Sequence, residues 1–191
     1  MEAKLFEEPF PFTAEWYETR EHAPHLEQPA HMGRLHKTAE LVNFAVDNYN
    51  AQSVVDLGCG DGGLLSLLEG KVKAWGYDLM QANVEAAKHR MVVVSFGDFI
   101  NEPIEWGDLT VITECLEHLE DPHSVVKLIA SHSRLIVASS PVSETAEWHD
   151  PVHAWAWDAE GYGNLIKSAG FEVIAHEIVD GTFQCILGLQ R

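Results

Sequence analysis

The segment TECLEHL begins at Thr113, directly after an apolar run, and holds two glutamates and a histidine within five positions. Glu114, Glu117 and His118 are spaced i, i+3 and i+4, so a helix that began here would place their side chains on one face. Carboxylate and imidazole groups that converge in this way are typical ligands of divalent transition metals. Glutamates in the first turn of a helix are also favoured by the helix dipole without any catalytic role. The spacing alone leaves a metal site and an ordinary helix start as alternatives.

A second group of polar residues lies in the segment EWHDPVHAWAWD, which begins at Glu147. It contains His149, Asp150 and His153 among tryptophans. Histidine is a common metal ligand, and because its pKa lies near neutral pH it also serves as a general base. His118, His149 and His153 are therefore the candidate catalytic residues of the chain.

Short apolar runs that alternate with amphipathic stretches must position these groups. The runs span residues 53–58, 73–78, 91–96, 108–113, 134–139, 171–178 and 183–189, and helical patterns fall near residues 32–50, 62–69, 80–89, 122–131 and 158–169. Strands that alternate with helices predict a parallel sheet covered on both faces. Only the short turn VDGT separates the last two runs, so we expect them to form an antiparallel hairpin at the end of the sheet.

The length and the periodicity together predict the domain organisation. A chain of 191 residues fits one domain with a sizeable core. Residues 1–31 show no clear period, and we expect them to form an N-terminal arm or cap. Residues 32–191 then form the single α/β domain.

A glycine-rich turn, DLGCGDGG, follows the first apolar run and begins at Asp56. Such a turn between a strand and a helix lets a ligand approach the backbone, and Gly58, Gly60 and Gly63 have the G-x-G-x-x-G spacing of a nucleotide site. The carboxylates of Asp56 and Asp61 flank the loop and oppose a pyrophosphate. They suit a ligand without phosphate that carries an amine and a sulfonium, namely S-adenosylmethionine.

Two further acids follow the next two runs. Asp78 lies twenty positions beyond Gly58, where a carboxylate accepts hydrogen bonds from ribose hydroxyls. Asp98 is placed to accept from the adenine amino group, with Phe99 against the ring. Each acid alone is equally typical of a helix cap or a turn. Three acids at the ends of three consecutive strands favour a cofactor site.

From about residue 32 to its end, the chain resembles the class I S-adenosylmethionine-dependent methyltransferases. VVDLGCGDG resembles their glycine motif, WGYD their ribose-binding motif, FGDF their third motif, and SAGFEVI the segment that leads into their sixth strand. The resemblance implies a doubly wound, Rossmann-like fold with a seven-stranded, mostly parallel sheet, an antiparallel last strand and helices on both faces. The predicted cofactor-binding residues are Asp56, Gly58, Cys59, Gly60, Asp78, Leu79, Asp98, Phe99 and Glu114.

The pattern E-x-x-E-H with a distal histidine in an aromatic-rich loop is similar to two groups of metal-dependent O-methyltransferases. These are the small-RNA 2′-O-methyltransferases and the ubiquinone-biosynthesis O-methyltransferases. The resemblance implies Glu114, Glu117, His118 and His153 as metal ligands, with His149 competing for the fourth place. This ligand set suits Mn²⁺, Fe²⁺, Co²⁺ or Zn²⁺ better than Mg²⁺. Because a cation can bind two vicinal oxygens, we expect O-methylation of a small diol-, sugar- or catechol-like acceptor.

Composition bears on partners and on location. The chain has 30 acidic residues against 12 Lys and Arg, a net charge of −18, which makes nucleic acid an unlikely partner. For its one basic stretch, Arg20 to Lys37, we favour a solvated face over an anion site. The three cysteines have no paired spacing, and no signal-peptide or membrane-spanning pattern is found, so a cytoplasmic location is expected.

Several other functions remain compatible with the same residues. The first is a metal-independent small-molecule methyltransferase in which a histidine acts as general base. The second is an RNA 2′-O-methyltransferase. A nicotinamide-dependent oxidoreductase and a non-catalytic binding module on the same fold are more distant alternatives.

Overall fold

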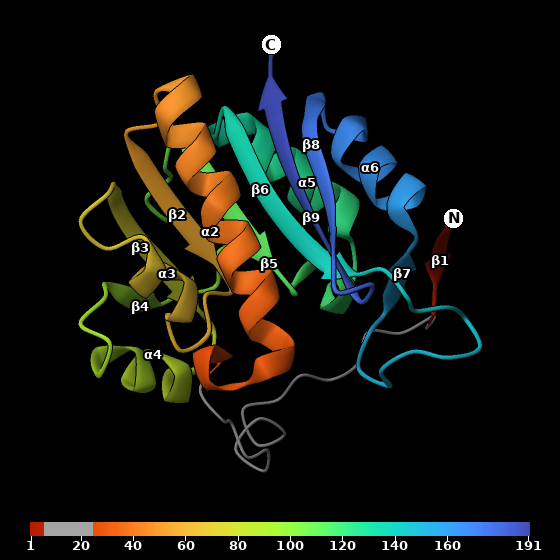
Figure 1. Ribbon diagram of the computed structural model, residues 1–191, viewed down its shortest axis with the longest axis horizontal. Helices are drawn as coiled ribbons and strands as arrows, with labels where there is room; N and C mark the ends of the chain where they lie inside the picture. The colour runs from red at the N-terminus through yellow and green to blue at the C-terminus, as the bar shows by residue number, and fades with distance from the viewer. Residues whose placement is uncertain (6–24) are drawn as a thin grey trace.

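The computed structural model describes residues 1–5 and 25–191, and its centre is a seven-stranded sheet (Figure 1). The strands are β2 (Ser53–Leu57), β3 (Lys73–Asp78), β4 (Val94–Phe96), β5 (Leu109–Thr113), β6 (Leu135–Pro141), β8 (Phe171–Val179) and β9 (Phe183–Gln190). Their order across the sheet is β4-β3-β2-β5-β6-β9-β8. Strand β9 runs antiparallel to both of its neighbours, β6 and β8, whereas the other neighbouring strands pair in parallel. The predicted doubly wound sheet and its terminal hairpin are therefore confirmed.

The helices lie close to the predicted ranges. They are α2 (Pro29–Tyr49), α3 (Gly63–Leu67), α4 (Gln81–Lys88), α5 (Pro122–His132) and α6 (Ala159–Ser168). Helix α5 begins where the side chain of Asp121 caps the backbone N–H of Ser124 at 3.0 Å, with proline at its first position. Helix α2 ends at Asn50, which adopts a left-handed conformation with φ 54°.

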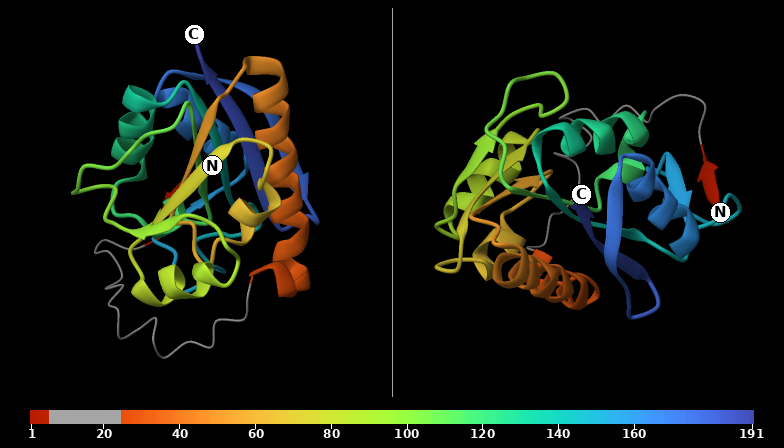
Figure 2. Two further views of the ribbon diagram at one scale, coloured as in Figure 1. Left: turned by 90° about the vertical axis from the view of Figure 1, so that its left-hand side faces the viewer. Right: turned by 90° about the horizontal axis from the view of Figure 1, so that it is seen from above.

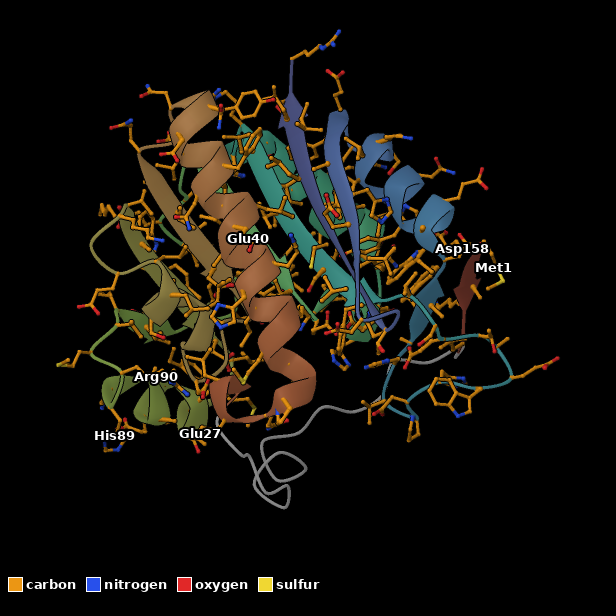
Figure 3. The ribbon with its side chains drawn as sticks, viewed as in Figure 1. Met1, Glu27, Glu40, His89, Arg90 and Asp158 are labelled. Carbon is orange, nitrogen blue, oxygen red and sulfur yellow. The ribbon has the colours of Figure 1, made fainter. Side chains whose placement is uncertain are left out.

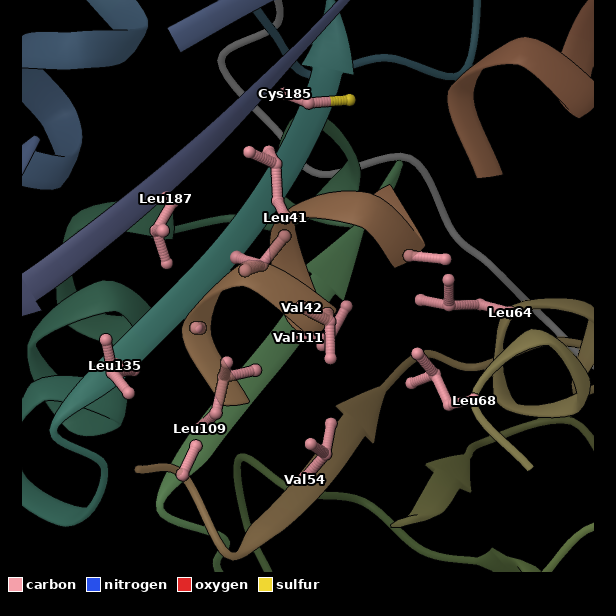
Figure 4. Packing of buried hydrophobic residues seen from close by; sticks show 14 of the residues in the cluster. Leu41, Val42, Val54, Leu64, Leu68, Leu109, Val111, Leu135, Cys185 and Leu187 are labelled. Carbon is pink, nitrogen blue, oxygen red and sulfur yellow. The ribbon is translucent and has the colours of Figure 1, made fainter. Parts of the chain in front are cut away.

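Two apolar layers hold the helices against the sheet. Helices α2 and α3 cover one face, whereas α5 and α6 cover the other, as the views in Figure 2 show. Side chains alternate between the layers along each strand, since Leu109 and Val111 of β5 pack toward α2 and Ile112 packs toward α5. Figure 4 shows part of the α2 layer, with Leu41, Val42, Val54, Leu64, Leu68, Leu109, Val111, Leu135, Cys185 and Leu187.

A second, two-stranded sheet was not predicted. Strand β1 (Glu2–Lys4) pairs antiparallel with β7 (Trp155–Trp157), and the indole N–H of Trp157 donates to a carboxylate oxygen of Glu2 at 2.9 Å. Met1 and Asp158 lie side by side at this end of the molecule (Figure 3). The first residues of the chain are thus strand rather than irregular, and α2 begins at Pro29 rather than near residue 32.

Part of the expected N-terminal arm falls outside the described residues. This includes Trp16 and Tyr17, for which we considered a role as a cap over the site, and the first residues of the basic stretch. No helix in the described part of the chain is long and apolar enough to span a membrane.

Candidate functional site

The carboxyl ends of the central parallel strands bring the chemistry-bearing residues to one edge of the sheet. Strand β2 pairs in parallel with β3 on one side and with β5 on the other. Asp56, Asp78 and Glu114 therefore lie at or just beyond the ends of three adjacent strands. In open α/β sheets this edge is where ligands bind.

The glycine loop is held close to both of its neighbouring strands. The backbone N–H of Gly58 donates to the carbonyl of Tyr77 at 2.9 Å, and the residue has φ 69°, a conformation that favours glycine. A Cβ atom on Gly58 would lie 3.1 Å from Sγ of Cys115. Cys59 is buried behind the loop. The loop therefore has no side chain at Gly58 or Gly60 that would separate a ligand from its backbone.

Asp56 is the most unusual group of the loop. Its side chain is 1% exposed, and both carboxylate oxygens lack a hydrogen-bond partner within the described structure. Burial, together with the nearby Asp78 carboxylate, raises the pKa of Asp56 to about 8, although Arg34 acts in the opposite direction. A buried acid without a partner is costly, and a ligand cation placed beside it removes that cost.

Asp78 organises the loop from the neighbouring strand. Oδ2 of Asp78 accepts the backbone N–H of Gly60 at 2.8 Å, and Oδ1 accepts that of Met80, also at 2.8 Å. Asp78 is 6% exposed at the end of β3, and its Oδ1 also accepts the side-chain amide of Asn83 at 3.0 Å. Leu79, which follows it, is 54% exposed.

The other two acids near the loop are engaged by the protein itself. Oδ1 of Asp98 accepts the backbone N–H of Ile100 at 3.0 Å, and Oδ2 accepts the side-chain amide of Asn101 at 2.8 Å. Asp61 forms an ion pair with Arg90 at 2.7 Å. Asp98 thus closes a turn, which was the alternative that we considered for any single acid. Phe99 is half-buried and packs on the α5 layer.

Glu114, the first residue after β5, has a strained backbone conformation. Its φ is 49°, which is rare for a residue with a side chain and is often found at functional sites. Oε1 of Glu114 accepts the hydroxyl of Ser139 at 2.8 Å and lies 3.8 Å from Nε of Arg34. A short 3₁₀ turn, Leu116–His118, takes the place of the helix that would have aligned Glu114 with its neighbours.

Glu117, His118 and His153 converge. One ligand atom of each lies within 4.8 Å of the others. Glu117 is fully buried, and neither carboxylate oxygen has a hydrogen-bond partner among the described residues. Burial, followed by the charge of Glu114, raises the pKa of Glu117 well above its ordinary value. Glu114 does not belong to this group of three.

The two histidines each have an oxygen atom beside Nδ1 of the ring. Nδ1 of His118 lies 3.2 Å from the carbonyl oxygen of Val152, which only accepts, so this nitrogen carries the hydrogen. Nδ1 of His153 lies 2.7 Å from Oε2 of Glu144 and donates to that carboxylate. With the hydrogen on Nδ1, the lone pair of each ring lies on Nε2, the atom through which such an imidazole binds a cation. Second partners of this kind orient ligating histidines in metal sites.

His149 lies apart from this group. Its Nδ1 is 3.1 Å from the carbonyl oxygen of Thr145 in the same loop. Among the described residues it belongs to no cluster of potential metal ligands, whereas His153 does.

Two residues of the site were missed by sequence reasoning. Glu144 is 7% exposed and accepts from both His153 and the backbone N–H of Asp150. Tyr162 of α6 is fully buried, its hydroxyl has no partner within the described structure, and its pKa is raised first by burial and then by Glu117. Neither residue lies in a recognisable motif, so only their burial reveals them.

Comparison with known proteins gives the family. A family model described as a methyltransferase domain matches residues 30–176. The chain belongs to this methyltransferase family. A comparison with curated protein sequences gives no match.

Solved structures with the fold of this methyltransferase include cofactor complexes. Magnesium protoporphyrin IX methyltransferase from Synechocystis PCC 6803, with bound S-adenosylhomocysteine, has a TM-score of 0.70 at 14% identity, covering 92% of this chain and 93% of that one. A methyltransferase from Clostridium acetobutylicum has a TM-score of 0.63 at 13% identity, with 82% and 92% covered. Human N-acetylserotonin methyltransferase, with bound S-adenosylmethionine, has a TM-score of 0.63 at 18% identity, with 86% and 57% covered.

The residues at the sheet edge fit this cofactor. The glycine loop has no side chain at Gly58 or Gly60, and Asp78 ends the strand where the ribose-binding acid is expected. Asp56, which has no hydrogen-bond partner in the described structure, suits a ligand that carries an amine and a sulfonium. S-adenosylmethionine is therefore supported as the cofactor of the methyltransferase, and the family assignment decides against a nicotinamide-dependent oxidoreductase.

Proposed function

We propose that this methyltransferase transfers a methyl group from S-adenosylmethionine to a hydroxyl of a small acceptor with the help of a divalent cation. The observation that carries the proposal is the Glu117 carboxylate, which is fully buried and unpartnered among the described residues. It stands within 4.8 Å of two imidazole nitrogens. A buried carboxylate in that position is stabilised by a cation and is costly without one.

The donor set bears on which cation would bind. One carboxylate and two imidazoles are typical of Fe²⁺, Mn²⁺, Co²⁺ and Zn²⁺ sites that keep open positions for substrate. Mg²⁺ prefers oxygen ligands and is less typical of such a set. Glu114 was predicted as a further ligand. It lies nearer to Ser139 and Arg34 in this structure, so we place the core of the proposed site on Glu117, His118 and His153.

The residues of the site would hold and orient the acceptor hydroxyl. When bound, the cation supplies a Lewis acid that lowers the pKa of a hydroxyl and fixes two neighbouring oxygens. When bound, S-adenosylmethionine supplies a methyl group on a positively charged sulfur. Glu117, His118 and His153 keep the hydroxyl beside the ligand edge that Asp56 and Asp78 define. Correct placement of this kind contributes much of the rate of a displacement reaction.

The acceptor class follows from the proposed cation and from charge. A cation that fixes two oxygens selects vicinal hydroxyls, as in a diol, a sugar or a catechol. The net charge of −18 disfavours RNA, which remains the competing acceptor for this arrangement. The cytoplasmic location also stays a prediction, based on three free cysteines.

The deciding experiment is a titration of metal-stripped protein, saturated with adenosylhomocysteine, with Mn²⁺. We expect stoichiometric binding to the native protein and to a Glu120→Ala control, whose carboxylate is exposed three residues from Glu117. Binding should disappear in Glu117→Ala. Equal binding to Glu117→Ala and to the native protein, or no binding to the native protein, would refute the metal site.

One observation favours a second candidate function, methyl transfer without metal. Glu144 and His153 form a carboxylate–histidine pair in which the carboxylate orients the ring, an arrangement that suits a general base. Turnover of catechol in the presence of a chelator, abolished by His153→Gln, would support this function. A folded protein that binds adenosylhomocysteine but methylates no acceptor with or without Mn²⁺ would instead be a binding module.

A further inference from the structure

Strand β1 lies beside β7, which directly follows the loop that carries His153 (Figure 1). The two strands pair antiparallel, with Glu2 opposite Trp157 at one end. The pairing continues beyond the other end of β7, because the backbone N–H of Leu5 donates to the carbonyl of Ala154 at 2.8 Å. The first residues of the chain therefore reach the residue next to His153.

Ala154 is also bonded to the candidate metal site. Its backbone N–H donates to the carbonyl of Glu117 at 2.7 Å. Close by, Nδ1 of His118 lies 3.2 Å from the carbonyl oxygen of Val152. Two members of the cluster are thus bonded to the segment before β7, and the third, His153, belongs to that segment. A path of two backbone hydrogen bonds leads from β1 through Ala154 to Glu117.

The side chain of Glu2 anchors β1 on both of its neighbours. One carboxylate oxygen accepts the indole N–H of Trp157 at 2.9 Å, and the other lies 3.1 Å from Nε2 of His123 on α5. The backbone of β1 also lies against α6, where a Cβ atom added to Gly161 would overlap the carbonyl of Met1. Glycine permits this close approach because it has no side chain. Helix α6 therefore leaves the space that β1 needs.

We propose that β1 is a strap that positions the two segments carrying Glu117 and His153, with Glu2 as a positioning residue. The inference rests on the proposed function, because these segments form the acceptor side of that site. A segment held by hydrogen bonds has less conformational freedom, so its side chains lose less entropy when they bind a ligand. Linkage requires the reverse effect as well, so metal binding should tighten the docking of β1.

Gly161→Ala tests the strap, because the added methyl group displaces β1 while alanine suits a helix better than glycine. Gly163→Ala on the same helix is the matched control, since a Cβ there would make only an ordinary contact, with Nδ1 of His176 at 3.9 Å. Amide hydrogen exchange of the metal-free protein is read by mass spectrometry. It should rise roughly tenfold over residues 2–5 and 152–157 in Gly161→Ala, and stay at the native rate in Gly163→Ala. Faster exchange of residues 2–5 alone would overturn the proposal.

Glu2→Ala releases the strap in a second way, without added volume. Glu2→Gln keeps an oxygen acceptor for Trp157 and should raise the exchange of residues 152–157 less than Glu2→Ala does. Unchanged exchange of residues 2–5 in both Gly161→Ala and Glu2→Ala would show that these contacts do not hold β1, and this result would also overturn the proposal.

The metal arm uses protein saturated with adenosylhomocysteine. Gly161→Ala should bind Mn²⁺ roughly 10-fold more weakly than the native protein and Gly163→Ala, with adenosylhomocysteine affinity unchanged in all three. Mn²⁺ should slow the exchange of residues 2–5 in the native protein but not in Glu117→Ala, an effect that a merely structural strand would not show.

The two arms separate the strap from the proposed function. Equal Mn²⁺ affinity of the two glycine variants would overturn the strap and leave the metal site in place. Absence of Mn²⁺ binding to the native protein would refute the proposed function, and the exchange of the metal-free variants would then decide the strap alone.

Discussion

Glu144 and His153 are joined by a hydrogen bond of 2.7 Å between Oε2 of the carboxylate and Nδ1 of the ring, and both side chains are largely buried. This contact orients the ring, which has a nitrogen within 4.8 Å of ligand atoms of Glu117 and His118. The carboxylate also holds the backbone N–H of Asp150 at 3.0 Å. One acid therefore shapes the loop and orients its histidine.

The first prediction concerns this pair. Glu144→Ala should weaken Mn²⁺ binding by roughly 10- to 100-fold, because His153 loses the partner that orients it. Glu144→Gln keeps an oxygen acceptor and should lose less. Adenosylhomocysteine affinity should stay unchanged in both variants, as should Mn²⁺ affinity in Glu147→Ala, an exposed change in the same loop.

The position of the hydrogen on the His153 ring can be measured without metal. Nitrogen-15 NMR of metal-free native protein should show His153 with its hydrogen on Nδ1, and Glu144→Ala should shift the population toward hydrogen on Nε2. A native ring with its hydrogen on Nε2 would contradict the orientation that we describe.

The second prediction contrasts two buried acids in stability. Glu117→Met removes a carboxylate that has no hydrogen-bond partner among residues 1–5 and 25–191 and replaces it with an apolar chain of similar length. The metal-free protein should therefore gain about 1–3 kcal/mol in free energy of unfolding. Glu144→Met removes an acceptor used by His153 and Asp150, and the protein should lose stability. Urea unfolding of both variants decides the matter. A loss in both would mean that Glu117 stabilises the fold.

The third prediction follows from the pKa of Asp56, which burial and Asp78 raise to about 8. In the unfolded chain the group has an ordinary pKa of about 3.9. Between these values the folded protein holds a proton that the unfolded chain releases. The free energy of unfolding therefore falls as pH rises from about 4 to about 8, by at most about 1.4 kcal/mol per pH unit.

Asp56→Asn removes this proton, so its stability relative to the native protein should rise across the same pH window. Asp47→Asn, an exposed change on α2, should follow the native curve. Urea titrations at several pH values in the absence of cofactor provide the measurement. Parallel curves for native protein and Asp56→Asn would show that the carboxyl group ionises normally.

The fourth prediction separates backbone strain from close packing in the cofactor loop. Gly58 and Gly70 have similar positive φ values, 69° and 74°, but only at Gly58 would a Cβ meet a neighbour, Sγ of Cys115 at 3.1 Å. Gly70→Ala should cost about 1–2 kcal/mol in unfolding free energy and leave adenosylhomocysteine binding intact. Gly58→Ala should cost more and weaken that binding. Equal effects of the two changes on stability and binding would argue against a tightly packed loop.

The sequence determined the sheet and the order of its elements along the chain, and it predicted the place of the cofactor. Short continuous apolar runs reflect strands buried on both faces, and amphipathic stretches of period 3.6 reflect helices buried on one face, so neighbouring residues already encode both. The loop that contains Gly58 and the acid Asp78 could be found for the same reason, because a glycine turn after a strand has a fixed spacing to the next strand. Strand β1 had no such signal, since three residues carry too little periodicity.

Only the tertiary structure decided which acids and bases meet. Glu117 and His153 are far apart in the chain, and their approach depends on how the loop before β7 packs against the turn after β5. Glu114 does not join the group, because it adopts a left-handed backbone conformation that no pattern of side chains predicts. Tertiary packing also buried Glu144 and Arg34, which as sequence are two ordinary charged residues, so the predicted solvated face is wrong for Arg34. Burial removes water from such groups, and their chemistry then depends on the few atoms that replace it.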